Sequence, residues 1–83
     1  MAQQHVSLSV AQVRILRALS CGGMLTEHQI KVSASLTEWK TRQALANLVS
    51  HELIVTGARK GRYEITQRGR NVLATEASDS HQA

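Results

Sequence analysis

Three hydroxyl residues mark the starts of three short helices in the first part of the chain. Ser9 and Thr26 are each followed three residues later by a glutamine, which is the capping-box spacing, in which side chains and backbone satisfy one another's hydrogen bonds at a helix start. Thr37 is a third residue of a type that caps helices. The sequence therefore predicts three helices, over residues 10–20, 27–33 and 38–51.

A hairpin and a fourth helix are predicted further along the chain. Residues 53–56 form a run rich in β-branched side chains, and residues 62–65 alternate between polar and apolar, so that both segments are typical of strands. Residues 57–61 lie between them, contain two glycines and favour a turn. Thr66 then provides a cap for a final helix over residues 67–77.

The length of 83 residues suits a single domain. We expect a flexible N-terminus over residues 1–7, a folded domain over residues 8–77 and a disordered polar tail over residues 78–83. Phe is absent and there is one Trp and one Tyr, so the core must be aliphatic. Cys21 is the only cysteine and cannot form an internal disulfide, which favours a cytoplasmic location.

The third predicted helix has one apolar and one polar face. At about 100° per residue, the apolar face that should point into the core consists of Thr41, Leu45, Leu48 and Val49. The opposite face carries Lys40, Gln43 and Asn47. Primary amides donate and accept together, which matches the edge of adenine, whereas lysine binds guanine or phosphate. The few residues before this helix fit a helix-turn-helix, whose second helix enters the major groove of DNA.

Basic residues concentrate in and after the predicted hairpin. The whole chain has a net charge of +4, and residues 59–70 alone carry five basic residues and one acidic residue, a local charge of +4. The basic residues are Arg59, Lys60, Arg62, Arg68 and Arg70. Such a patch attracts polyanions such as nucleic acid. The alternative is a solvated surface without a ligand.

Several short segments, taken in order, carry a resemblance to a known family. The segment Tyr63-Glu64-Ile65-Thr66, followed by Gly69 and Val72-Leu73, is the most telling. Further matching positions are Gln12-Val13-Arg14-Ile15-Leu16, Leu25-Thr26, Ala44-Leu45, Leu48 and Leu53-Ile54. From residue 8 to residue 73 the chain resembles the winged-helix domain of MarR-type and PadR-type bacterial transcriptional regulators.

The resemblance implies a fold and a function. The fold would be α+β and mostly α, a winged helix-turn-helix with a three-helix core, a two-stranded wing and a C-terminal helix. The function would be sequence-specific binding of double-stranded DNA as a transcriptional regulator. The implied contacts of the recognition helix are Thr37, Trp39, Lys40, Gln43 and Asn47, and those of the wing, at phosphates or in the minor groove, are Arg59, Lys60 and Arg62.

The contacts of three residues can be considered one by one. Trp39 either stacks on a deoxyribose or packs against the second helix. Arg42 would extend from the edge of the apolar face to a phosphate or to an acidic neighbour such as Glu38. Arg68 is a further candidate for phosphate contact. The thin core and the symmetry of operator sites favour a homodimer.

A protein-binding adaptor that docks on an acidic partner is the rival interpretation. An adaptor would more often show an exposed apolar stripe on the third helix, where this chain has polar residues. The sequence shows no nucleophile paired with a base, no metal-ligand spacing and no phosphate loop. We therefore expect neither enzymatic activity nor a metal, cofactor or small-molecule ligand.

Overall fold

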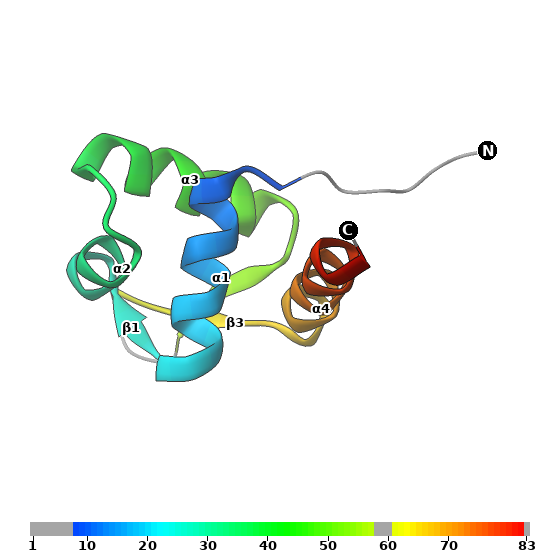
Figure 1. Ribbon diagram of the computed structural model, residues 1–83. Coiled ribbons are helices and arrows are strands. Elements are labelled where there is room, and N and C mark those ends of the chain that lie inside the picture. The colour runs from blue at the N-terminus through cyan, green and yellow to red at the C-terminus, as the bar shows by residue number, and fades with distance from the viewer. Residues whose placement is uncertain (1–7, 58–60, 83) are drawn as a thin grey trace.

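The computed structural model describes residues 8–57 and 61–82 as helices packed around a small sheet (Figure 1). The helices are α1 (Val10–Gly22), α2 (Glu27–Ala34), α3 (Glu38–Ser50) and α4 (Gln67–Gln82), and the strands are β1 (Leu25–Thr26), β2 (Ile54–Thr56) and β3 (Arg62–Ile65). The mostly helical α+β architecture predicted from the sequence is confirmed. The predicted flexible N-terminus, residues 1–7, and two predicted wing residues, Arg59 and Lys60, lie outside the described residues.

The first three helices begin where their predicted caps place them. The Ser9 hydroxyl accepts a hydrogen bond from the Gln12 amide at 3.2 Å, and the Gln12 side chain accepts one from the Ser9 amide at 2.8 Å. The same reciprocal pair joins Thr26 and Gln29. The Thr37 hydroxyl accepts from the backbone amide three residues on. These caps satisfy amides that have no partner inside a helix, and so they fix each helix start.

The helix ends depart from the prediction, most of all in α4. The predicted end was Ala77, with a disordered tail over residues 78–83, but α4 runs to Gln82. The residues after Ala77 include neither glycine nor proline, so nothing in the sequence breaks the helix there. At the end of α2, Ser35 adopts a left-handed conformation with φ of 56°, a position that usually takes glycine.

The sheet has three antiparallel strands in the order β1-β3-β2, one strand more than the predicted hairpin. β1 consists of Leu25 and Thr26, which pair with Tyr63 and Arg62 of β3. Two residues are too few to show the alternation that identifies a strand in a sequence. Because β3 is the central strand, the wing is tied directly to the segment that leads into α2.

The core is aliphatic, as predicted. Its buried residues are Ile15, Leu16, Leu19, Ile30, Ala34, Ala44, Leu45, Leu48, Leu53, Ile54 and Ile65. Thr41 is fully buried as well, and its hydroxyl donates to the Thr37 carbonyl at 2.8 Å. The prediction that Val49 points inward is wrong, since the residue is 40% exposed. The buried face of α3 is centred closer to Ala44 than the sequence suggested, which turns Val49 outward.

Thr66 and Gly69 fasten the start of α4 to the start of β2. The Thr66 hydroxyl accepts from the Gly69 amide at 2.9 Å and lies 2.9 and 3.0 Å from the carbonyl oxygens of Glu52 and Leu53. A Cβ on Gly69 would collide with the Leu53 carbonyl and lie 2.8 Å from the Ile65 side chain. The hydroxyl therefore caps the helix, and the missing side chain of the glycine allows the close approach.

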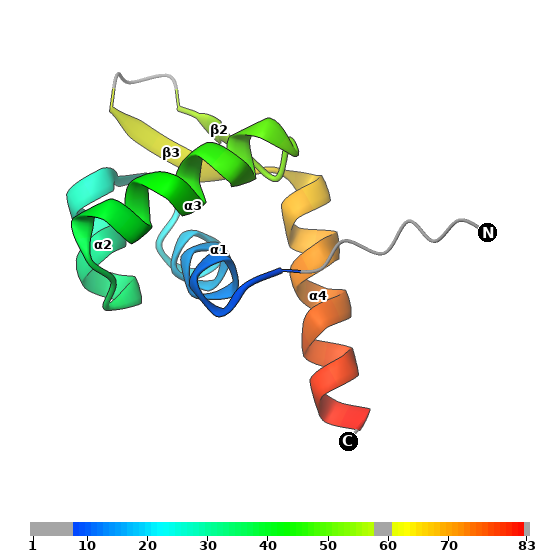
Figure 2. The ribbon, with the colours of Figure 1, turned by 90° about the horizontal axis from the view of Figure 1, so that it is seen from above.

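The arrangement leaves one side of α3 uncovered. Viewed from above, α3 runs across the middle of the molecule with the β2–β3 hairpin on one side and α1 on the other (Figure 2). α4 starts at the base of the hairpin and extends away from the other helices (Figure 2). Among the helices of residues 8–57 and 61–82, none combines the length and the apolar character that crossing a membrane requires.

Candidate nucleic-acid interface

The middle of the uncovered face of α3 is a row of four exposed residues. At about 100° per residue they lie within about 60° of one another and opposite the buried face. They are Trp39, Gln43, Ala46 and Ser50. Trp39 and Gln43 were predicted as contacts. Ala46 and Ser50 were not, and the side chain of Ala46 offers no hydrogen bond that would mark it as a contact.

Lys40 and Asn47 flank this row on the side that faces α1. Together with Gln43 and Trp39 they line an open hollow of about 560 Å³, whose other wall is the N-terminal turn of α1. Trp39 is 68% exposed, so it does not pack away against α2. The structure therefore brings four of the five predicted recognition residues together on one surface. Thr37, the fifth, is exposed but its hydroxyl is used to cap α3.

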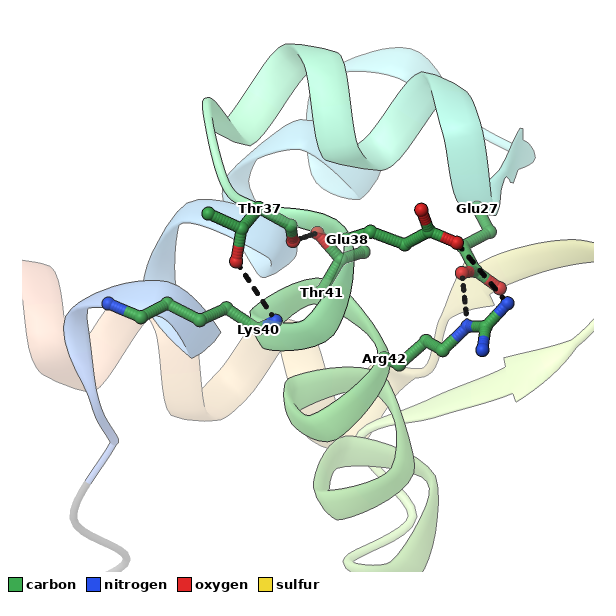
Figure 3. A network of polar contacts seen from close by, with 6 residues as sticks. All are labelled: Glu27, Thr37, Glu38, Lys40, Thr41 and Arg42. Carbon is green, nitrogen blue, oxygen red and sulfur yellow. Dashed lines mark hydrogen bonds and ion pairs between the residues drawn. The ribbon is translucent and has the colours of Figure 1, made fainter.

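Arg42 lies on the other flank and is held by two carboxylates (Figure 3). Its Nε lies 3.1 Å from Glu27 Oε2 and its Nη2 lies 3.4 Å from Glu38 Oε2. Glu38 is the acidic neighbour that the sequence suggested, whereas Glu27 is fifteen residues away in the chain and joins it only through the fold. The three side chains carry a net charge of −1 and link the start of α2 to the first turns of α3.

A second open hollow, of about 500 Å³, separates α3 from the wing. Its wall on the wing side includes Thr56 and Tyr63, and its wall on the α3 side includes Ala46 and Ser50. Tyr63 is only half-buried: it packs against the core, as predicted, and also faces this hollow. The outward face of α3 and the wing thus border one continuous concave surface.

The predicted basic residues are not all on this surface. Arg62 is half-buried on β3, in the hairpin. Arg68 lies at the start of α4, at the end of β3 away from the hairpin tip, and its Nη1 is 3.9 Å from Glu52 Oε1. The structure therefore places Arg68 and Arg62 at opposite ends of β3. Among residues 8–57 and 61–82, no three His, Cys, Asp or Glu side chains gather in the way that metal ligands do.

Solved structures of bacterial regulators have a similar fold. A MarR family transcriptional regulator from Silicibacter pomeroyi superposes with a TM-score of 0.83 at 25% identity, over 92% of this chain and 52% of the other. BpsR of Bordetella bronchiseptica, whose DNA binding is regulated by 6-hydroxynicotinic acid, superposes with a TM-score of 0.84 at 19% identity. The match covers 95% of this chain and 59% of BpsR. The chain has a MarR-type winged-helix fold.

Further comparisons show how much of each protein the similarity covers. ZitR of Lactococcus lactis matches 99% of this chain at 22% identity with a TM-score of 0.76, over 57% of its own length. The chain thus spans between half and three fifths of the length of these structures. A scan against models of protein families found no match, and neither did a search of curated protein sequences. The expectation that no small molecule binds stays a prediction.

Proposed function

We propose that the chain binds double-stranded DNA as a transcriptional regulator, with α3 in the major groove and the wing against the backbone or minor groove. The observation that carries this proposal is the division of α3 into two faces. Its inner face builds the core, whereas its outer face is exposed and presents Gln43 and Asn47, whose side chains have no hydrogen-bond partner among the described residues. In helix-turn-helix proteins this is the surface that reaches base edges.

The wing supplies the complementary charge in this proposal. Arg62 lies on β3, and Arg59 and Lys60 come just before it in the sequence, so that three positive charges fall within four positions. Contacts from such side chains to phosphates position a protein on the duplex, while contacts from the helix to base edges select the sequence. The MarR-type fold supports the same two roles, with phosphate contacts from the wing and base contacts from α3.

A salt series tests the proposal. Fluorescence anisotropy with a labelled duplex would give the affinity of the wild type, of a wing variant (Arg59→Ala, Arg62→Ala) and of a control (Arg14→Ala, Arg17→Ala). Both variants lose two positive charges, but the control residues line a hollow between α1 and α2 that α3 does not border. The affinity should fall at a log–log slope of about −0.9 per neutralised phosphate.

The two variants should then differ. We expect the wing variant to flatten the slope by up to about 1.8 and the control to change it little. Weak binding that does not depend on salt, in all three proteins, would overturn the proposal and favour the protein-binding adaptor. Equal flattening in both variants would leave DNA binding but remove the specific role of the wing.

We also propose that two copies bind a two-fold symmetric site. A single small module covers only about 600–1,000 Å² of protein surface on DNA, which is little for tight specific binding. Two copies would place their recognition helices about one helical turn apart. Sedimentation with duplexes that carry one or two half-sites measures this directly, and a 1:1 complex on the symmetric duplex would contradict it.

A further inference from the structure

The residues on the outer face of α3 point to the base composition of the DNA site. We propose that α3 reads A·T base pairs, with Gln43 and Asn47 on adenine and Ala46 against the thymine methyl group, and that Arg42 is withheld from guanine by Glu27 and Glu38. This inference rests on the proposed DNA binding. Its supporting observations are the two exposed amides, the exposed Ala46 and the ion pairs of Arg42.

The two amides form the adenine-reading element. Gln43 and Asn47 are one helical turn apart, both exposed, and neither side chain takes part in a hydrogen bond among the described residues. A primary amide donates to adenine N7 and accepts from the adenine N6 amino group in one bidentate contact. No other uncharged side chain supplies a donor and an acceptor at that spacing as well as an amide does.

Ala46 supplies an apolar contact among these polar groups. It is exposed, lies three residues after Gln43 and borders the hollow between α3 and the wing. An alanine methyl group in this position can contact the C5-methyl group of thymine, which is the only apolar group on a base edge in the major groove. A side chain that binds adenine, as Gln43 can, and one that contacts the thymine methyl group, as Ala46 can, together select A·T pairs.

Arg42 is the side chain best suited to guanine, and it is engaged elsewhere. Arginine bound bidentately to guanine is the commonest specific contact in the major groove. Here its Nε and Nη2 lie 3.1 and 3.4 Å from two different carboxylates (Figure 3). Its side chain is 66% exposed, so each pair favours this position by at most about fivefold, and the two pairs together bias the guanidinium away from a base. If Arg42 turned to a base, Glu27 and Glu38 would be left unpaired beside the phosphates. The other cation on α3, Lys40, lies on the flank that faces α1.

The test separates this inference from DNA binding itself. Sites would be selected from a randomised duplex pool by the wild type and by the double variant Glu27→Gln, Glu38→Gln, in which Arg42 loses both ion pairs. Each selected thymine would then be replaced by uracil, which lacks only the methyl group. We expect A·T-rich half-sites for the wild type, a gain of guanine for the double variant, and about a fourfold loss of affinity at the thymine that Ala46 contacts, the equivalent of one buried methylene.

An Ala46→Ser variant tests the methyl contact, because it keeps the size of the side chain while replacing the apolar contact; it should lose the sensitivity to uracil. The Arg14→Ala, Arg17→Ala variant is the control, because both residues line a hollow that α3 does not border, and it should keep that sensitivity. Salt-dependent binding with guanine-rich selected sites, or with no uracil effect at any thymine, would overturn the inference and leave the proposed function standing. Absence of salt-dependent binding by the wild type would overturn both.

Discussion

The replacement Gly69→Ala tests the packing that holds α4 against the rest of the domain. A Cβ at this position would collide with the Leu53 carbonyl oxygen and lie 2.8 Å from Ile65 Cγ1. The carbonyl cannot simply retreat, because it also accepts hydrogen bonds from the Thr66 amide and hydroxyl, both at 3.0 Å. Backbone must therefore move, and at least one of these hydrogen bonds must lengthen.

The magnitude follows from three terms. Overpacking a close contact costs about 1–3 kcal/mol, and a lost hydrogen bond costs about 1 kcal/mol. Alanine offsets this by about 1 kcal/mol because it is a better helix former than glycine. We therefore expect the free energy of unfolding to fall by about 1–3 kcal/mol, which corresponds to a decrease in Tm of roughly 4–24 °C for a domain of this size.

Thermal unfolding followed by circular dichroism measures this, with Gly22→Ala as the matched control. A Cβ on Gly22 would meet only side-chain atoms of Leu25, at 3.2 and 3.3 Å, and that side chain can turn away. The control should therefore change the free energy of unfolding by less than about 1 kcal/mol. A Gly69→Ala protein as stable as the wild type would refute the packing argument.

Three further substitutions probe the caps and the core, each by urea or thermal unfolding. Thr66→Ala should cost about 1–2 kcal/mol through the lost cap and carbonyl contacts, and Thr66→Ser should restore most of it; equal losses would contradict the role of the hydroxyl. Ser35→Gly should raise Tm by a few degrees, since it relieves a left-handed serine at about 1 kcal/mol; a lower Tm would argue against strain. Leu48→Ala, at a fully buried position, should cost about 2–5 kcal/mol, and a loss below 1 kcal/mol would place Leu48 outside the core.

The helix starts and the main hairpin could be predicted because their signals are local. Ser9 and Thr26 each have their partner three residues away in the sequence, and the structure shows both reciprocal hydrogen bonds. The strand over residues 62–65 was predicted with its observed bounds, because alternation over four residues is enough to indicate a strand. The resemblance based on Thr66 and Gly69 also led to the observed fold.

Features that depend on the fold could not be predicted in the same way. The pairing of Leu25 with Tyr63 joins positions far apart in the chain, so β1 has no sequence signal of its own. The ion pair between Arg42 and Glu27 arises only once α2 and α3 pack together. Val49 was assigned to the wrong face because a small error in the centre of the buried face moves residues at its edge from inside to outside.

The central claim is that duplex DNA binds to the outer face of α3 and to the wing. Backbone amide NMR shifts, recorded while a duplex is titrated into the protein, test this most directly. The account predicts that the largest shift changes fall on residues 37–50 and 57–62, and that the amides of Arg14, Arg17 and Ser33, beside the hollow between α1 and α2, change little. Changes centred on that hollow, or none at all at low salt, would contradict the account.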